Sequence, residues 1–217
     1  MRTISQAVEE VIQRSPFLVE AISEGVANNA EIARKIRPAV EKRLYEKVSD
    51  SAIAMALHRL SKNIKRAPYS EKLLKQMSDI TVRSNLIEYT CANSDALPEI
   101  LETISKSARK RKDTFLNFSR GLHESLIIVG QEFEKEVESA LKGEKRTRKL
   151  SNLSAITMRL PEESLSVPGM YYPILKAIAA EGISFVEVMS VRTEFTILFE
   201  DKDIDRAFST LKRIISD

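Results

Sequence analysis

The last third of the chain constrains the fold most strongly, because strand and helix patterns alternate along it at regular intervals. Five segments follow one another in the order strand, helix, strand, strand, helix: Ser154–Leu160, Gly169–Glu181, Ile183–Val191, Phe195–Glu200 and Asp203–Ile215. The first and fourth segments alternate apolar with polar residues, as strands with one buried face do. The two helical segments repeat apolar residues at helical spacing. Two helices can cover one face of an antiparallel sheet, so this order predicts a ferredoxin-like α+β layout.

A motif in this region resembles a known family. The run Val167–Ile183 begins with a Val-Pro-Gly turn, continues as a helical segment and ends with a Gly-Ile pair. It resembles the signature of ACT domains. The continuation Met189–Ile197, in which a serine precedes a Thr-Glu pair and a strand, is similar to a segment in the regulatory half of aspartokinases. The resemblance covers Ser154–Asp217 and implies an ACT domain. Members of that family sense different amino acids, and some sense none.

The same element order occurs a second time, earlier in the chain. Strand, helix, strand, strand and helix patterns are found at Ile80–Ala92, Leu97–Lys110, Thr114–Phe118, Leu122–Val129 and Glu132–Leu141. We interpret this region as a divergent first ACT-like repeat, matched by pattern and not by residue identity. Aspartokinases carry two such repeats that pack side by side, and the resemblance implies the same here. Two small sheets would expose unpaired edges, so we expect a homodimer formed through the ACT sheets.

The predicted fold class is therefore α+β, with an N-terminal helical, helix-turn-helix-like bundle followed by two ferredoxin-like βαββα ACT repeats. The expected domains are 1–70 (helical), 71–147 (divergent ACT-like repeat) and 148–217 (ACT domain). The usual ACT fold ends with a fourth strand, whereas this chain ends at Asp217 directly after the last helical segment. We expect the missing edge strand to be either absent or supplied by another segment, for which Leu150–Leu153 is the candidate.

Residues 1–70 show helical spacing of apolar residues and no convincing strand pattern, which predicts a small helical bundle. A helix over Asn29–Ile36 and a last helix over Ser49–Arg66 resemble a helix-turn-helix. The Arg37-Pro38 pair is expected to bend or restart the first of these helices, which makes the connection Pro38–Val48 longer than a usual turn. Ser49 and the residue after it are expected to cap the last helix.

The last helix of this bundle is the candidate for nucleic-acid recognition. Its exposed face would carry the candidate nucleic-acid-binding residues Ser51, His58, Arg59 and Lys62. Residues 1–70 carry 12 Lys and Arg against 8 Asp and Glu, whereas residues 151–217 carry 7 against 10. The basic end is thus the helical one, which favours DNA as a candidate partner. Two alternatives stay open: a solvated helical surface, and a bundle for dimerisation or partner docking.

The resemblance also implies where an effector would bind. In ACT domains the effector usually lies between the loop after the first strand, the N-terminus of the first helix and a neighbouring repeat, because free N–H groups and the helix dipole there attract a carboxylate. The corresponding residues are Ser166, Gly169 and Met170, and Gly169 would allow close approach to the backbone. The alternative for Gly169 is a tight strand-to-helix turn. Glu162 is the candidate for meeting an ammonium group, with a solvated carboxylate as the alternative.

Other functional classes lack support in the sequence. The single Cys91 cannot form an internal disulfide and is expected to be a core residue. His58 and His123 lie in different expected domains, and neither GxxxxGK[ST] nor GxGxxG occurs. We therefore expect no enzyme activity, no cofactor and no metal site. No apolar run is long enough to span a bilayer, and Glu9 and Glu10 interrupt the N-terminus, so a cytoplasmic protein without membrane contact is expected.

Two function classes remain. In the first, the chain is an amino-acid-sensing transcriptional regulator whose helical domain contacts DNA while the ACT pair binds the effector. In the second, it is a non-catalytic regulatory subunit or scaffold that docks onto an enzyme of amino-acid metabolism such as aspartokinase. The expected small-molecule partner in both is an amino acid effector, whose identity the sequence does not specify.

Overall fold

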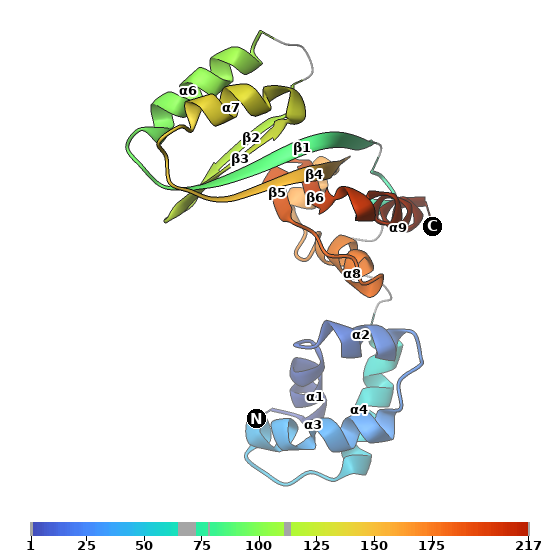
Figure 1. Ribbon diagram of the computed structural model, residues 1–217. Coiled ribbons are helices and arrows are strands. Elements are labelled where there is room, and N and C mark those ends of the chain that lie inside the picture. The colour runs from blue at the N-terminus through green and yellow to red at the C-terminus, as the bar shows by residue number, and fades with distance from the viewer. Residues whose placement is uncertain (1, 65–72, 78, 111–113, 217) are drawn as a thin grey trace. The chain divides into compact units, whose positions relative to one another are not determined.

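The computed structural model describes residues 2–64, 73–77, 79–110 and 114–216. The chain divides into two compact units, Met1–Tyr69 and Ser70–Asp217 (Figure 1). The first unit is helical, and the second combines an antiparallel sheet with helices.

The first unit contains the helices α1 (Ile4–Ile12), α2 (Pro16–Ser23), α3 (Asn29–Leu44) and α4 (Asp50–Asn63). Helix α4 packs against both α1 and α3. One face of each helix is apolar, and these faces form a single core. The fully buried members of that core are Ala7, Val8, Ile12, Ala33, Val40, Ile53 and Leu57.

Polar side chains fix where these helices begin. Thr3 and Gln6 form a reciprocal capping box at the start of α1. The Asn28 side chain accepts hydrogen bonds from the backbone of Ala30 and Glu31 at the start of α3. Ser49 accepts from the Ala52 N–H at 3.2 Å, which confirms the predicted cap of the last helix.

The predicted restart of the helix at Pro38 does not occur. The helix continues through Pro38 to Leu44 and ends at Tyr45, which adopts a left-handed conformation. Ile36 and Val40, on either side of the proline, are buried, so the apolar face of the helix stays continuous. This burial offsets the loss of the backbone hydrogen bond that proline cannot donate. The connection to α4 is therefore 45–49 and not Pro38–Val48.

The second unit is built on a six-stranded sheet with the order β2-β3-β1-β4-β6-β5, in which all neighbouring pairs are antiparallel. The strands are β1 (Ile80–Ala92), β2 (Leu116–Arg120), β3 (Glu124–Gly130), β4 (Arg146–Arg159), β5 (Glu187–Val191) and β6 (Glu194–Glu200). The helices are α6 (Leu97–Ala108), α7 (Glu134–Ala140), α8 (Tyr172–Ala180) and α9 (Ile204–Ser216). Short 3-10 helices lie at η1 (Gln131–Phe133), η2 (Glu162–Ser166) and η3 (Asp201–Asp203). The predicted order of strand, helix, strand, strand, helix occurs twice.

Two long strands, β1 and β4, are shared between the two halves of this sheet. The C-terminal part of β1 pairs with β3, and the C-terminal part of β4 pairs with β6. The segment Ile80–Arg83 of β1 pairs with β4 of the second half, and Arg146–Leu150 of β4 pairs with β1 of the first half. Each half thus receives its fourth strand from the other. The candidate segment Leu150–Leu153 is not the fourth strand of the second half, because Ile80–Arg83 takes that place.

The two long strands bend at equivalent positions. Asn85 and Asn152 both have φ of 58°, a left-handed conformation, and each stands in a Ser-Asn-Leu triplet. Asparagine tolerates this conformation better than other non-glycine residues. The register between β1 and β4 shifts at these points, and the leucines that follow, Leu86 and Leu153, lie directly opposite each other. The expected domain division between residues 147 and 148 falls inside β4.

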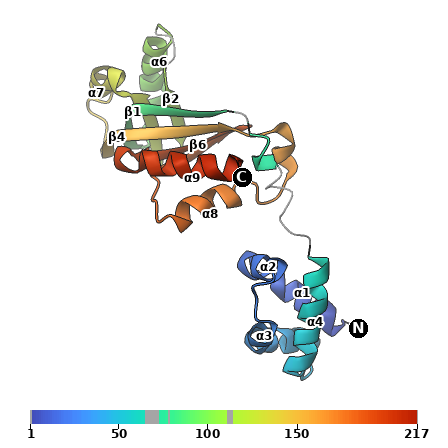
Figure 2. The ribbon, with the colours of Figure 1, turned by 90° about the vertical axis from the view of Figure 1, so that its right-hand side faces the viewer.

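The helices cover the sheet on one face of each half. Ile87, Tyr89 and Ile127 contact α6 and α7 in one core, and a second core beneath α8 and α9 contains Ile156 and Phe195. The opposite, helix-free face carries a third buried cluster: Leu86, Ile128, Leu153, Ala155 and Leu198. Both halves contribute to this cluster, so their helix-free faces pack against each other. In both views α6 and α7 lie on one side of this unit and α8 and α9 on the other (Figure 2).

Candidate functional site

The predicted effector residues lie in the loop between β4 and α8. Ser166 ends η2, and its hydroxyl donates a hydrogen bond to the carbonyl of Glu163 at 3.0 Å. Gly169 has φ of +74°, and its carbonyl accepts from the N–H of Tyr172 at 3.0 Å. A side chain added at Gly169 would meet no atom within 4 Å, so the backbone conformation, and not lack of space, favours glycine here.

Met170 and Glu162 have surroundings that the sequence did not reveal. The Met170 side chain is 4% exposed and packs in the core beneath α8 and α9, so a ligand could reach only its backbone. The Glu162 carboxylate lies 2.7 Å from the Arg192 guanidinium. Both side chains are exposed, and Arg192 stands in the turn between β5 and β6 with φ of 53°. The carboxylate predicted to meet an ammonium group therefore already has a cationic partner.

The loop is anchored by aromatic and hydroxyl contacts. The Tyr171 ring stacks on Phe195 with centroids 4.3 Å apart, and the Tyr171 hydroxyl lies 2.9 Å from that of Ser190. Ser164 is buried in η2, and its hydroxyl has no hydrogen-bond partner among the described residues. These contacts hold the start of α8 against β5 and β6.

The equivalent loop of the first half has a structural role. Ser94 donates to the Glu144 carboxylate at 2.5 Å, and Asn93 accepts from the Ser125 hydroxyl at 2.6 Å. The residue at the N-cap of α6 is Ala96, without a side-chain hydrogen bond. This loop is held by its own side chains.

A groove on the helix-free side of the sheet was not predicted from the sequence. Its volume is about 260 Å³, and it is lined by Thr114, Phe115, Leu116, Asn117, Thr157, Met189, Val191, Glu194 and Thr196. In the sheet order, β2 and β5 are the two edges, so only the folding of the sheet brings residues from both ends to one groove. The Thr157 and Thr196 hydroxyls lie 2.8 Å apart between neighbours that are otherwise apolar, such as Ala155 and Leu198. Hydroxyls at such positions are the only sign of the groove in the sequence.

A buried carboxylate lies on the same helix-free face. Glu88 is 0% exposed, and neither of its oxygens has a hydrogen bond of standard geometry among the described residues, although the Thr90 side chain lies close enough to lower the pKa of Glu88 slightly. The nearest cation is the Arg148 guanidinium, at 3.8 Å and half exposed. Burial raises the pKa of Glu88, and the negative charge of Glu187 raises it further, while Arg148 acts in the opposite direction. Glu88 is thus held toward its neutral form.

In the helical unit, the four candidate nucleic-acid residues all have exposed side chains on α4: Ser51, His58, Arg59 and Lys62. Ser51, His58 and Lys62 recur at helical spacing, opposite the buried Ile53 and Leu57. The Ser51 hydroxyl lies 3.0 Å from that of Ser49, beside the N-cap of the helix. The residues therefore form an exposed face on one helix.

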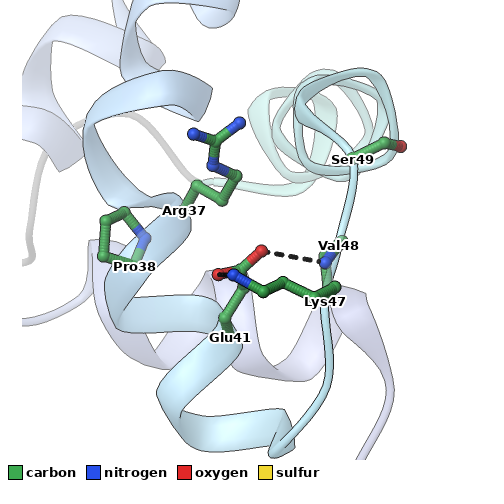
Figure 3. A pocket seen from close by; sticks show the side chains of 6 residues that line it. All are labelled: Arg37, Pro38, Glu41, Lys47, Val48 and Ser49. Atoms are coloured by element: carbon green, nitrogen blue, oxygen red, sulfur yellow. Dashed lines mark hydrogen bonds and ion pairs between the residues drawn. The ribbon is translucent and has the colours of Figure 1, made fainter.

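A recess lies beside the start of this helix, between α3 and the connection to α4 (Figure 3). Glu41 is its central residue and accepts from the Val48 N–H at 3.1 Å. Lys47 lies 3.7 Å from the same carboxylate, and Arg37 pairs with Asp50 at 3.1 Å. Both basic side chains of the recess are engaged by carboxylates, so the recess serves to hold the connection in place.

Among the described residues, no group of three or more His, Cys, Asp or Glu side chains is arranged to hold a metal ion. In the same part of the chain, no helix combines the length and apolarity needed to cross a bilayer. Cys91 is buried, as expected of a core residue.

Solved structures provide the comparison. The ligand-free regulatory subunit of aspartate kinase from Thermus thermophilus matches with a TM-score of 0.52 and 8% identity, over 64% of this chain and 97% of that chain. The regulatory subunit from Thermus flavus matches with a TM-score of 0.52 and 9% identity, over the same shares of the two chains. The aspartate kinase of Clostridium acetobutylicum matches with a TM-score of 0.53 and 11% identity, over 64% of this chain.

The match spans only 35% of the Clostridium enzyme but nearly all of the Thermus regulatory subunits. No protein-family model matches the sequence, and no curated protein matches it. At such low identity the likeness is one of fold. In fold, the chain resembles the regulatory, ACT-domain region of aspartokinases, as its sequence motif implied.

Proposed function

We propose that the chain is a non-catalytic regulatory protein whose second unit binds an amino acid. The support that carries this proposal is the shared fold with regulatory subunits that lack the rest of the kinase. The loop before α8 adds to it, because Gly169 leaves the backbone open to a ligand and the motif around it resembles that of ACT domains. The effector would contact Ser166 and the backbone of Gly169 and Met170.

Amino-acid binding is tested by a thermal-shift screen of the full chain against each of the twenty protein amino acids. A ligand that binds only the folded state at about 100 times its Kd adds about 2.7 kcal/mol to the free energy of unfolding, which is a measurable rise in Tm. A chain whose Tm is unchanged by every amino acid at millimolar concentration would not be a sensor of amino acids.

The role of the helical unit distinguishes two forms of this proposal. In the first, α4 contacts DNA through Ser51, His58, Arg59 and Lys62, and the protein is a ligand-responsive transcriptional regulator. In the second, the helical unit docks onto an enzyme of amino-acid metabolism, such as an aspartokinase catalytic subunit. The exposed face of α4 favours the first, and the fold of the second unit favours the second.

The two forms separate in a binding experiment with mixed-sequence duplex DNA. A DNA-binding protein retains the duplex at low salt and releases it steeply as salt rises, because phosphate contacts displace counterions. If the protein does not retain the duplex at low salt, the DNA-binding form is rejected and the regulatory-subunit form remains. In both forms we expect a homodimer through the sheets, so sedimentation at tens of micromolar should give twice the mass of one chain.

A further inference from the structure

The groove on the helix-free face combines polar groups in an arrangement suited to a small charged molecule. The Asn117 amide lies on one wall, from the start of β2, and the paired hydroxyls of Thr157 and Thr196 lie on the other, from β4 and β6. Apolar side chains complete the lining, among them Phe115 and Met189. Such a mixture of apolar surface with a few placed polar groups is typical of ligand sites.

One acidic side chain, Glu194, is part of the groove lining. Arg159 is outside that lining and lies directly opposite Glu194 in the register of β4 and β6. Directly opposed residues of antiparallel strands project from the same face of the sheet. Arg159 lies two residues after Thr157, and Glu194 lies two residues before Thr196, so all four side chains are on the same face. Both side chains are exposed, and within the described ranges neither has an ion-pair partner. A carboxylate and a guanidinium are thus both available to a ligand.

The volume limits what can bind. About 260 Å³ is just below the range of roughly 300 to 1,000 Å³ found for pockets that hold drug-sized ligands. A molecule of amino-acid size fits this space, whereas a nucleotide does not. The two free charges then specify a zwitterion, with an ammonium group for Glu194 and a carboxylate for Arg159.

We propose that this groove is a binding site for a free α-amino acid, separate from the loop before α8. This inference rests on the proposed function, binding of an amino acid by the second unit, and places the ligand in the groove as the alternative to the loop before α8. Glu194 binds the ammonium group, Arg159 binds the carboxylate, and Asn117 reaches the ligand from the other half of the sheet. A ligand held by both halves fixes one relative position of them, so its binding free energy depends on how the halves pack.

The experiment uses the full chain and the amino acid that gives the largest thermal shift in the screen of twenty. Isothermal titration calorimetry measures its Kd for the wild type and for Glu194→Gln, Arg159→Gln and Asn117→Ala. Each of the two charge variants should weaken binding about tenfold or more, because each removes a charged hydrogen-bond partner. Both residues are exposed, so Tm without ligand should stay within about two degrees. Glu124→Gln removes an exposed carboxylate outside the groove and is the matched control, which should change Kd less than twofold, whereas Glu162→Gln reports on the loop before α8.

The carboxamide of the same amino acid gives a second readout. It keeps the ammonium group and lacks the carboxylate, so Arg159→Gln should leave its Kd unchanged while Glu194→Gln weakens it. Unchanged binding in both charge variants would overturn the groove site and leave amino-acid sensing intact, particularly if Glu162→Gln then reduced affinity. Absence of binding by the wild type would instead reject the proposed function, and the groove site with it.

Discussion

Leu86 of β1 lies directly opposite Leu153 of β4, and both side chains are 1% exposed in the cluster between the two helix-free faces. Truncation there leaves a cavity that neither half can fill by itself. Leu86→Ala should therefore lower the free energy of unfolding by about 2 to 5 kcal/mol. Denaturant unfolding measures the change. Val82→Ala on the same strand is the control, because Val82 is 41% exposed and its truncation should cost much less. Equal losses in the two variants would contradict this packing.

The left-handed conformation of Asn85 and Asn152 predicts which substitutions at these positions will lower stability most. Replacement by alanine should cost about 1 to 2 kcal/mol at each position, since a β-carbon is disfavoured at positive φ. Replacement by glycine should be close to neutral. Thermal unfolding of the four single variants measures the order, and alanine variants as stable as the glycine variants would show that the bends do not require this conformation.

Gly169 should respond to backbone strain and not to side-chain size. Its φ is +74° and the space around it is open, so Gly169→Ala should destabilise the fold by an amount on the order of 1 to 2 kcal/mol, and Gly169→Val by moderately more because a β-branched side chain adds local strain at positive φ. Gly169→Asn should be tolerated better. Thermal unfolding without ligand gives this comparison. A much larger loss for valine than for alanine would mean that the loop closes over this position.

Glu88 should make stability depend on pH. Its pKa is raised above the ordinary 4.5 in the folded state, so the folded protein binds more protons than the unfolded chain in the window above pH 4.5. Stability from this group is therefore fully present below pH 4.5 and is lost as pH rises through the folded pKa. Glu88→Gln should flatten that part of the stability curve measured by denaturant unfolding. A curve with the same slope in wild type and variant would contradict the assignment.

The exposed face of α4 can be tested by charge removal. Arg59→Ala with Lys62→Ala should weaken DNA retention and reduce its salt dependence, while Tm stays within about two degrees. Lys135→Ala with Lys142→Ala is the matched control, because these residues are exposed in the second unit and the change in charge is the same. Equal DNA affinity in both double variants would remove α4 from a DNA interface.

Periodicity predicted the order of elements because most strands and helices bury one regular face. It missed the first part of β4, since Arg146 and Lys149 give no apolar alternation. That part is held by contacts between distant residues: Lys149 lies 2.7 Å from Glu134 and 2.8 Å from Glu138 on α7, and Arg146 lies 2.7 Å from Glu138. The helix through Pro38 was likewise decided by tertiary burial and not by local preference.

The residues of the candidate sites likewise fall into those that the sequence indicates and those that only the fold brings together. The loop at Gly169 was visible in the sequence because its residues are neighbours along the chain. The groove was not, because Asn117 and Glu194 meet only when the sheet folds over itself. Arg192 beside Glu162 was missed for the same reason, since a turn between two strands gives no sign of its partner.

The exchange of strand segments between the halves also governs the order of events during synthesis. The segment Ile80–Arg83 pairs with Ala155–Met158, more than seventy residues later in the chain. Such non-local pairing forms slowly, because loop-closure entropy must be lost before the contact is gained. On the ribosome, the segment Ile80–Arg83 of β1 must wait without its partner until β4 has emerged. The first half therefore cannot complete its sheet as an autonomous nascent domain, and the two halves fold together after most of the chain has been translated.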